Sequence, residues 1–221
     1  MKMKLKVMSV LLLFGVFSLF ILSSCVDMPT KAVTPPAALS YYRFINAAPG
    51  SLALSVDGKS LGSLDFKANT SYAEYTAGTK YVVLSTGDTL IMSMATDYRG
   101  TMCLLQEGGV PTFLRANEMR VFDPATAEKG KLRAIHLSAD AGAVDIKATG
   151  PETLEWTGVE YKDIGGYKDA TPGNYTVTVT QVDSVNAVLS FPVTVGTERS
   201  TAFIVGSIAG TTLSAVALKD N

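Results

Sequence analysis

The stretch Tyr175-Thr176-Val177-Thr178-Val179-Thr180 alternates apolar and hydroxyl side chains with a period of two residues. This alternation is typical of a β-strand that packs one face in a core and turns the other to water. Similar short runs, separated by turn residues, predict further strands at residues 81–84, 90–95, 101–105, 187–190, 193–195, 201–208 and 213–218. Because long stretches of helical periodicity are missing, the sequence predicts an all-β fold of antiparallel β-sandwiches, immunoglobulin-like or transthyretin-like.

Two parts of the chain resemble each other. The run Arg43-Phe44-Ile45-Asn46-Ala47 is echoed ninety residues later by Arg133-Ala134-Ile135-His136-Leu137. Further along, Arg99-Gly100-Thr101 is echoed a hundred residues later by Arg199-Ser200-Thr201. The nearly constant offset predicts two tandem β-sandwich units, residues 40–123 and 131–221, joined at residues 123–130.

The paired openings, Arg43 to Gly50 and Arg133 to Ile146, resemble the start of the bacterial domains of unknown function of family 4397. That family typically reads Arg, an apolar pair, His, a Ser-Pro-Asp-Ala turn and then Val-Asp-Val. The second unit has Ala139 where the proline is expected, and the first has Asn46 for the histidine and Ser55 for the later aspartate. The resemblance implies envelope or secreted β-proteins, often lipoproteins with the unit repeated, and it implies no activity.

The start of the chain has the pattern of a lipoprotein leader. Three lysines at positions 2, 4 and 6 precede an apolar run of 16 residues, 7–22, which as a helix would cover roughly 24 Å and fall short of a bilayer core. Leu22-Ser23-Ser24-Cys25 then resembles the bacterial lipobox, in which the cysteine is lipidated and becomes the first residue. We therefore expect a signal peptide at residues 1–24, a lipid on Cys25 and a proline-rich tether over residues 25–39. An uncleaved membrane anchor and an ordinary secretory signal are the alternatives.

The remaining composition narrows the function. The chain carries 19 Lys and Arg against 20 Asp and Glu residues, a net charge of −1, so it lacks the basic character of a nucleic-acid binder. With Cys25 lipidated, only Cys103 is left, so no disulfide is expected; Cys103 lies in a predicted strand and is expected to be an inert core residue. No cofactor is expected. We expect the protein to be held at a bacterial envelope membrane, with the outer membrane favoured.

His136 is the only histidine of the chain, and Ser138 and Asp140 lie close to it in sequence. Neighbours on one strand and turn cannot converge as a catalytic triad does, and the spacing matches no zinc site. Calcium held by Asp140 and Asp145 is a weaker alternative. The favoured interpretation is that His136 and Asp140 stabilise the turn between the first two strands of the second unit.

Aromatic and acidic residues cluster between positions 152 and 167. Glu152, Glu155, Glu160 and Asp163 could in principle supply the two carboxyl groups of a glycoside hydrolase. Trp156, Tyr161 and Tyr167 could instead form a ligand surface, because rigid rings give contact area at low entropic cost. A third interpretation is a solvated hairpin whose aromatic rings cover the sandwich. Elsewhere, Asp88-Thr89-Leu90 and Asp183-Ser184-Val185 resemble an O-glycosylation triplet of some envelope proteins.

These patterns together predict a lipid-anchored envelope protein that is a non-enzymatic binding or interaction module. Its expected partners are the membrane, through the lipid on Cys25, and a glycan or an envelope protein. Two alternatives stay open: a glycan-active enzyme, and a subunit of a surface assembly joined by strand exchange.

Overall fold

The computed structural model describes residues 37–120 and 128–220, whose regular secondary structure consists of strands. The first repeat contains β1 (Leu39–Asn46), β2 (Leu52–Val56), β3 (Lys59–Leu64), β4 (Ala73–Thr76), β5 (Gly78–Leu84), β6 (Thr89–Met94), β7 (Tyr98–Glu107) and β8 (Val110–Arg120). The second repeat contains β9 (Gly130–Leu137), β10 (Val144–Thr149), β11 (Thr153–Val159), β12 (Lys168–Ala170), β13 (Gly173–Gln181), β14 (Ala187–Val195), β15 (Arg199–Val205) and β16 (Ser214–Lys219). β1 begins at Leu39, the last residue of the predicted tether. Of the predicted joint 123–130, residues 123–127 lie outside the described residues.

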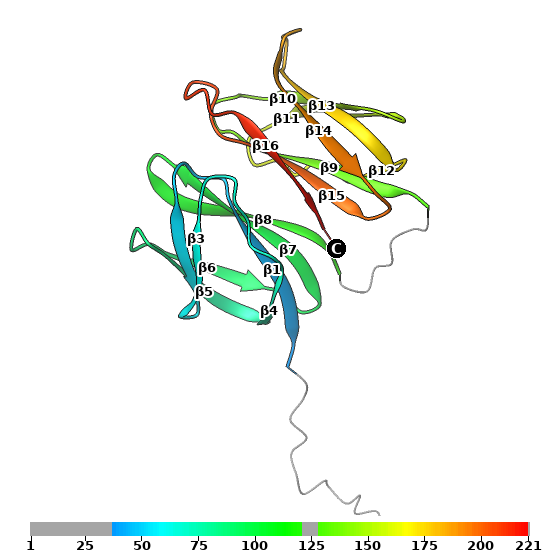
Figure 1. Cartoon of the computed structure of the whole chain (residues 1–221). Helices are drawn as coiled ribbons and strands as arrows, with labels where there is room; N and C mark the ends of the chain where they lie inside the picture. Colours follow the sequence, from blue (N-terminus) through cyan, green and yellow to red (C-terminus); the bar gives the residue numbers. More distant parts are fainter. Residues whose placement is uncertain (1–36, 121–127, 221) are drawn as a thin grey trace, which may run out of the picture. The chain divides into compact units, whose positions relative to one another are not determined.

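Each repeat forms two four-stranded sheets, and the strand order is the same in both (Figure 1). The first repeat has the sheets β4-β1-β7-β8 and β3-β2-β5-β6, and the second has β12-β9-β15-β16 and β11-β10-β13-β14. The prediction of an all-β fold with two sandwich repeats is therefore confirmed.

One pairing in each repeat is parallel, which the antiparallel expectation did not include. β1 runs parallel to β7 with Arg43 opposite Thr101, and β9 runs parallel to β15 with Arg133 opposite Thr201. The two segments that are echoed between the repeats are therefore partner strands within each repeat. The predicted strands 187–190 and 193–195 are one strand, β14, because Pro192 lies on an edge strand, where a missing N–H is tolerated.

Three cores hold these sheets together. One lies inside the first repeat and contains Phe44, Val82 and Met94, and a second lies inside the second repeat around Tyr175 and Val177. The third core takes side chains from both repeats: Ile45, Ala47, Cys103, Leu105 and Ala116 from the first, and Ile135, Leu137, Phe203 and Val205 from the second. Strands β1 and β9 thus bury alternate side chains in their own sandwich and at the seam between the repeats.

Equivalent arginines cross this seam in both directions. In the first repeat Arg43 donates from Nε to Thr101 Oγ1 at 2.7 Å and from Nη1 to the Lys219 carbonyl of the second repeat at 2.5 Å. In the second repeat Arg133 donates from Nε to Thr201 Oγ1 at 2.7 Å and from Nη1 to the Asn117 carbonyl of the first at 2.9 Å. The seam is therefore reciprocal, as an interface between the two subunits of a symmetric dimer is.

Asp220 is the polar centre of the seam. Its carboxylate accepts hydrogen bonds from Arg43 Nη2 at 2.6 Å, Thr201 Oγ1 at 2.6 Å and the Tyr167 hydroxyl at 2.7 Å. The side chain of Asp220 is fully buried, and that of Arg43 is 5% exposed. Burial, followed by the nearby Asp220 charge, raises the pKa of Tyr167, so its hydroxyl stays protonated and donates.

The fragment 37–221 is expected to fold without the preceding residues, because it contains the sixteen described strands and the three described cores and forms one compact unit. It should unfold in a single thermal transition, since unfolding one repeat exposes the shared core of the other. Near- and far-ultraviolet circular dichroism should give coincident melting curves. Two separated transitions would contradict a shared core.

Candidate functional site

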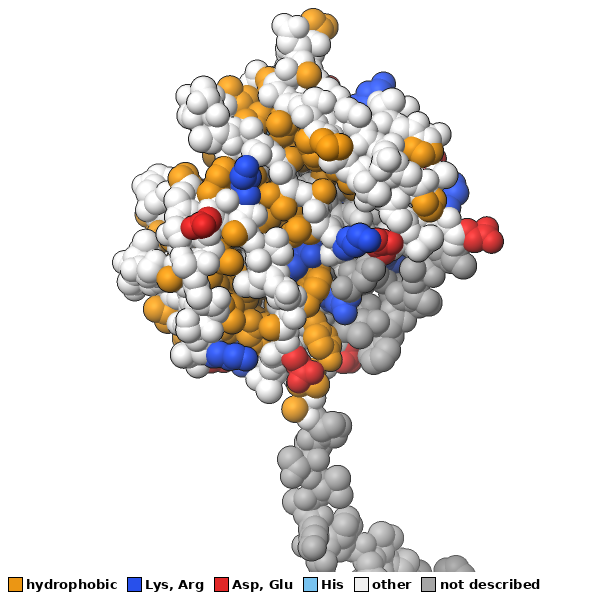
Figure 2. Space-filling model, in the orientation of Figure 1, with side chains coloured by type: hydrophobic (Ala, Val, Ile, Leu, Met, Phe, Trp, Pro, Cys, Tyr) orange, Lys and Arg blue, Asp and Glu red, His pale blue; other side chains and the backbone are white. Residues whose placement is uncertain are grey.

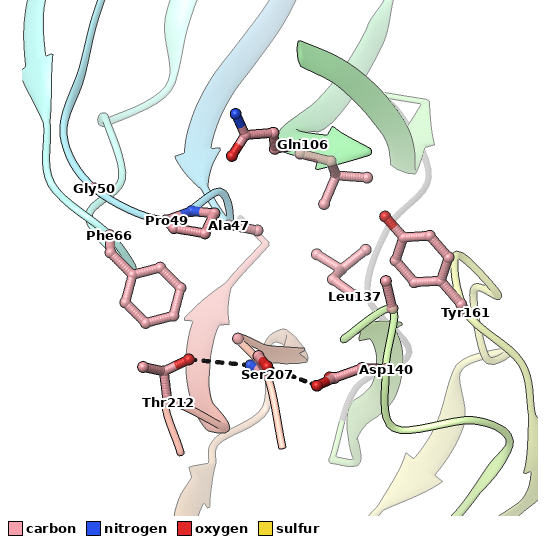
Figure 3. Close-up of a pocket in the computed structure, with 13 residues that line it drawn as sticks. Ala47, Pro49, Gly50, Phe66, Gln106, Leu137, Asp140, Tyr161, Ser207 and Thr212 are labelled. Carbon is pink, nitrogen blue, oxygen red and sulfur yellow. Dashed lines mark hydrogen bonds between the residues drawn. The ribbon is translucent and has the colours of Figure 1, made fainter. Parts of the chain in front are cut away.

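A pocket of about 320 Å³ opens at the seam, beside the shared core. Figure 3 shows Phe66 and Tyr161 on opposite sides of it, with Ala47, Pro49 and Leu137 between them. Its full lining is Ala47, Pro49, Gly50, Phe66, Leu105, Gln106, Leu137, Ala139, Asp140, Tyr161, Gly206, Ser207 and Thr212. The lining comes from both repeats, so the pocket exists only where the two repeats meet.

Equivalent positions of the two repeats supply the opposing walls. The ninety-residue offset makes Ala47 the counterpart of Leu137, and Pro49 the counterpart of Ala139. Phe66 is the counterpart of Tyr161. Asn69, three residues after Phe66, forms an isolated β-bridge with Ile45, and Ile164, three residues after Tyr161, forms one with Ile135, the counterpart of Ile45. Equivalent positions of the two repeats therefore face the same pocket.

The same local geometry places both rings. The residue after each ring is a lysine with a positive φ, 72° for Lys67 and 71° for Lys162. The Lys67 amide donates to the Asn46 carbonyl at 2.8 Å, and the Lys162 amide donates to the His136 carbonyl at 2.7 Å. These bonds tie each loop to β1 or β9 and direct the preceding ring toward the seam.

The two lysines also cover the rings. Lys67 Nζ lies 5.7 Å from the centre of the Phe66 ring, and Lys162 Nζ lies 5.6 Å from the centre of the Tyr161 ring. Lys162 forms an ion pair with Glu107 of the first repeat. Burial, followed by a hydrogen bond to Glu107, raises the pKa of Tyr161 to about 12, so the phenol is neutral at physiological pH.

Asp140 forms the polar floor of the pocket. Its carboxylate accepts hydrogen bonds from Ser207 Oγ at 2.6 Å, Ala209 N at 2.8 Å, Ile208 N at 3.0 Å and Ser138 Oγ at 3.2 Å. These bonds, led by the one from Ser207, lower the pKa of Asp140 to about 2. Asp140 thus fastens the turn after β9 to the loop after β15, a wider role than the turn alone that the sequence predicts.

His136 lies in the same turn and is fully buried. Its Nε2 is 2.9 Å from the Gly142 carbonyl oxygen, and its Nδ1 is 3.5 Å from the Ser138 amide nitrogen. The ring therefore donates from Nε2 and accepts at Nδ1, which requires the neutral form. The structure places His136 and Asp140 together on the turn that the sequence assigns to them.

Asn46 stabilises the equivalent turn of the first repeat. Its Nδ2 donates to the Gly50 carbonyl at 2.9 Å, and its Oδ1 accepts from the Ala48 amide at 3.0 Å. An amide side chain thus reproduces the donor and acceptor pattern of the His136 ring. The first repeat therefore keeps this turn, although it has Asn46 where the family pattern has a histidine.

Replacing His136 with Asn is expected to remove the dependence of stability on pH between 7.5 and 5. Burial lowers the pKa of His136 in the folded protein, so the unfolded chain, with its ordinary pKa of about 6.5, takes up the proton first as the pH falls. The free energy of unfolding of the wild type should therefore fall below about pH 6.5, by at most about 1.4 kcal/mol per pH unit. Asparagine does not titrate, and Asn46 stabilises the equivalent turn of the first repeat with one donated and one accepted hydrogen bond.

Urea unfolding of both proteins at pH 7.5 and pH 5 measures this difference. Because His136 is the only histidine, no second imidazole can mask the effect. Equal pH dependence in the two proteins would show that His136 is not held neutral.

The structure separates the three predicted aromatic residues. Tyr161 lines the seam pocket, whereas Trp156 and Tyr167 line a shallow depression beside β11 and β12. Trp156 is 7% exposed and donates from Nε1 to the Gly166 carbonyl at 3.0 Å. Tyr167 is half-buried and stacks on Arg133 at 4.4 Å, besides binding Asp220. Trp156 and Tyr167 therefore support the fold, and they form no common surface with Tyr161.

Cys103 and the two O-glycosylation-like triplets do not line the pocket. Cys25 lies outside the described residues, and Cys103 is fully buried in the shared core, as predicted. Thr89 and Ser184 of the two triplets are exposed at the β5–β6 and β13–β14 hairpins, which are equivalent in the two repeats. Within residues 37–120 and 128–220, no three His, Cys, Asp or Glu side chains group as metal ligands, and no helix could span a membrane.

Comparison with known proteins gives a family. No curated protein matches the chain. Among solved structures, a leucine-rich repeat protein from Bacteroides thetaiotaomicron VPI-5482 matches with 10% identity and a TM-score of 0.20. The match covers 78% of this chain and 27% of that one, so the chain spans about a quarter of that protein's length. The family model for a domain of unknown function, DUF4397, matches residues 40–147 and again residues 130–221, and the chain therefore belongs to this family, in two tandem copies.

Proposed function

We propose that this chain is a lipid-anchored cell-envelope protein whose two β-sandwich repeats act as a non-enzymatic binding module. The lipobox-like Leu22-Ser23-Ser24-Cys25 supports the anchor. The seam pocket carries the binding role, since both repeats contribute equivalent side chains to one open cavity. The macromolecular partner of the whole module is a glycan or an envelope protein, reached from the end of a tether.

Two of the four candidate acidic residues, Glu152 and Glu155, support binding over hydrolysis. The general acid of a glycoside hydrolase needs a raised pKa. Glu152 instead accepts a hydrogen bond from the Thr171 amide at 2.6 Å, which lowers its pKa. Glu155 pairs with Lys147 at 2.8 Å, and this bond lowers its pKa too. Both carboxyl groups are therefore ionised and engaged in structural contacts.

Strand pairing supports a module that is complete in one chain. An assembly subunit joined by strand exchange is expected to have an unpaired or missing strand in the monomer. Here β1 lies between β4 and β7, and its equivalent β9 lies between β12 and β15. Both central positions of the seam sheets are thus filled from within the chain.

Charge supports a partner other than nucleic acid. Figure 2 shows Lys and Arg side chains scattered on this face among uncharged ones and next to acidic ones. A nucleic-acid site would gather basic residues on one face or along one groove.

The test is capture by the immobilised fragment 37–221. We expect saturable retention of a component from a glycan array or an envelope extract, without any change in the retained molecule. The matched control is the same fragment unfolded in urea and then immobilised. Turnover of a substrate by the folded fragment, or retention no stronger than that of the control, would overturn the proposal.

A further inference from the structure

Polar side chains that line the seam pocket make hydrogen bonds within the chain. Asp140 accepts four hydrogen bonds, and Ser207 donates to Asp140 and accepts from the Gly210 amide at 2.8 Å. Gln106 Nε2 donates to the Gly109 carbonyl at 3.1 Å, and Thr212 Oγ1 accepts from the Ser207 amide at 3.1 Å. The four donors fill the acceptor positions of Asp140, the charged residue of the lining, so a charged ligand would lose its hydration without gaining a well-formed ion pair.

The remaining wall is apolar. Leu105 and Leu137 line the pocket and are almost fully buried, and Phe66 and Tyr161 flank it (Figure 3). The side chains of Ala47 and Pro49 add further carbon surface between the rings. Contact with this wall removes apolar surface from water, which is the main favourable contribution to binding in such sites.

The volume sets the size of the ligand. A dry cavity of about 150 Å³ accommodates benzene, which has six carbon atoms. By that measure the 320 Å³ of the seam pocket fits a ligand of about a dozen non-hydrogen atoms. The geometry points to a small, compact, uncharged apolar molecule, such as a bicyclic aromatic compound, as the ligand of the seam pocket. This inference adds a small-molecule ligand to the macromolecular partner of the proposed function. If the small molecule does not bind, the proposed function still stands.

Three probes with the same ring test the inference: indole, indole-3-carboxylate and tryptamine. Titration of the fragment 37–221, followed by amide and methyl chemical shifts, is expected to give a dissociation constant of ~0.1–1 mM for indole. The shifts should include the methyl groups of Leu105 and Leu137. Both charged analogues should bind at least threefold more weakly, because the one charged lining residue, Asp140, already accepts four hydrogen bonds and offers no well-formed ion pair. Equal or tighter binding of either analogue would overturn the inference, as would shifts confined to other residues.

Variants that fill the pocket provide a second test of the inference. Ala139→Trp and its counterpart Pro49→Trp place an indole ring at exposed positions on the two sides of the pocket. Each should weaken indole binding at least tenfold while keeping the circular dichroism spectrum. Ala187→Trp, on the exposed start of β14, is the matched control and should leave binding unchanged. Unchanged binding in both pocket variants would overturn the inference, whereas capture of the envelope partner tests the proposed function separately.

Discussion

Replacing Asp220 with Ala is expected to lower the free energy of unfolding by about 3–5 kcal/mol. The variant leaves Arg43, 5% exposed, without the carboxylate that accepts from its Nη2. It also removes the acceptor of the Thr201 and Tyr167 hydroxyls. A buried charge that loses its partner costs several times more than the loss of an exposed ion pair. Urea unfolding of the fragment 37–221 at pH 7.5 measures the difference.

The matched control is Glu155→Ala, which breaks the pair with Lys147. Both of these side chains are more than half exposed, at 53% and 55%, so the loss should stay below about 1 kcal/mol. Asp220→Asn keeps an acceptor for one donor but removes the charge, and it should fall between the two. A loss below 1 kcal/mol for Asp220→Ala would show that the seam does not depend on this carboxylate.

The sequence predicts the repeats but not their seam. Periodic strands, turn residues and the echoed Arg43 and Arg133 segments were sufficient to predict two β-sandwiches. The role of Asp220 was out of reach, because it follows from the reciprocal packing of the repeats and joins residues 177 positions apart. The parallel pairs were also missed, since alternation of side chains is the same in parallel and antiparallel strands.

The sequence likewise predicts some residues of the candidate site and not others. His136 and Asp140 could be assigned to their turn because their partners Ser138 and Gly142 are close in sequence. Phe66 was missed, because its counterpart Tyr161 lies 95 residues later and neither the ninety- nor the hundred-residue offset aligns them. Their shared aromatic-lysine dipeptides, Phe66-Lys67 and Tyr161-Lys162, were the available signal.

Replacing Cys25 with Ala is expected to move the protein from the membrane fraction to the soluble fraction. One acyl chain gives only marginal binding, whereas each further buried methylene adds about 0.8 kcal/mol, so several chains on one cysteine hold a protein permanently. Residues 26–38 of the predicted tether would span roughly 40 Å if they were fully extended. Metabolic labelling with a radioactive fatty acid, followed by fractionation of the envelope, measures both the lipid and the location.

Cys103→Ala is the matched control, because it removes the other cysteine of the chain. Cys103 is fully buried in the shared core, where no acyl chain could be attached without unfolding the seam. The control should therefore keep both the label and the membrane location, whereas Cys25→Ala loses both. Mass spectrometry of the wild type should find a mature chain that begins at a modified Cys25. An unmodified sulfur there, or a retained leader, would contradict the anchor and leave the binding module without its assigned place at the envelope.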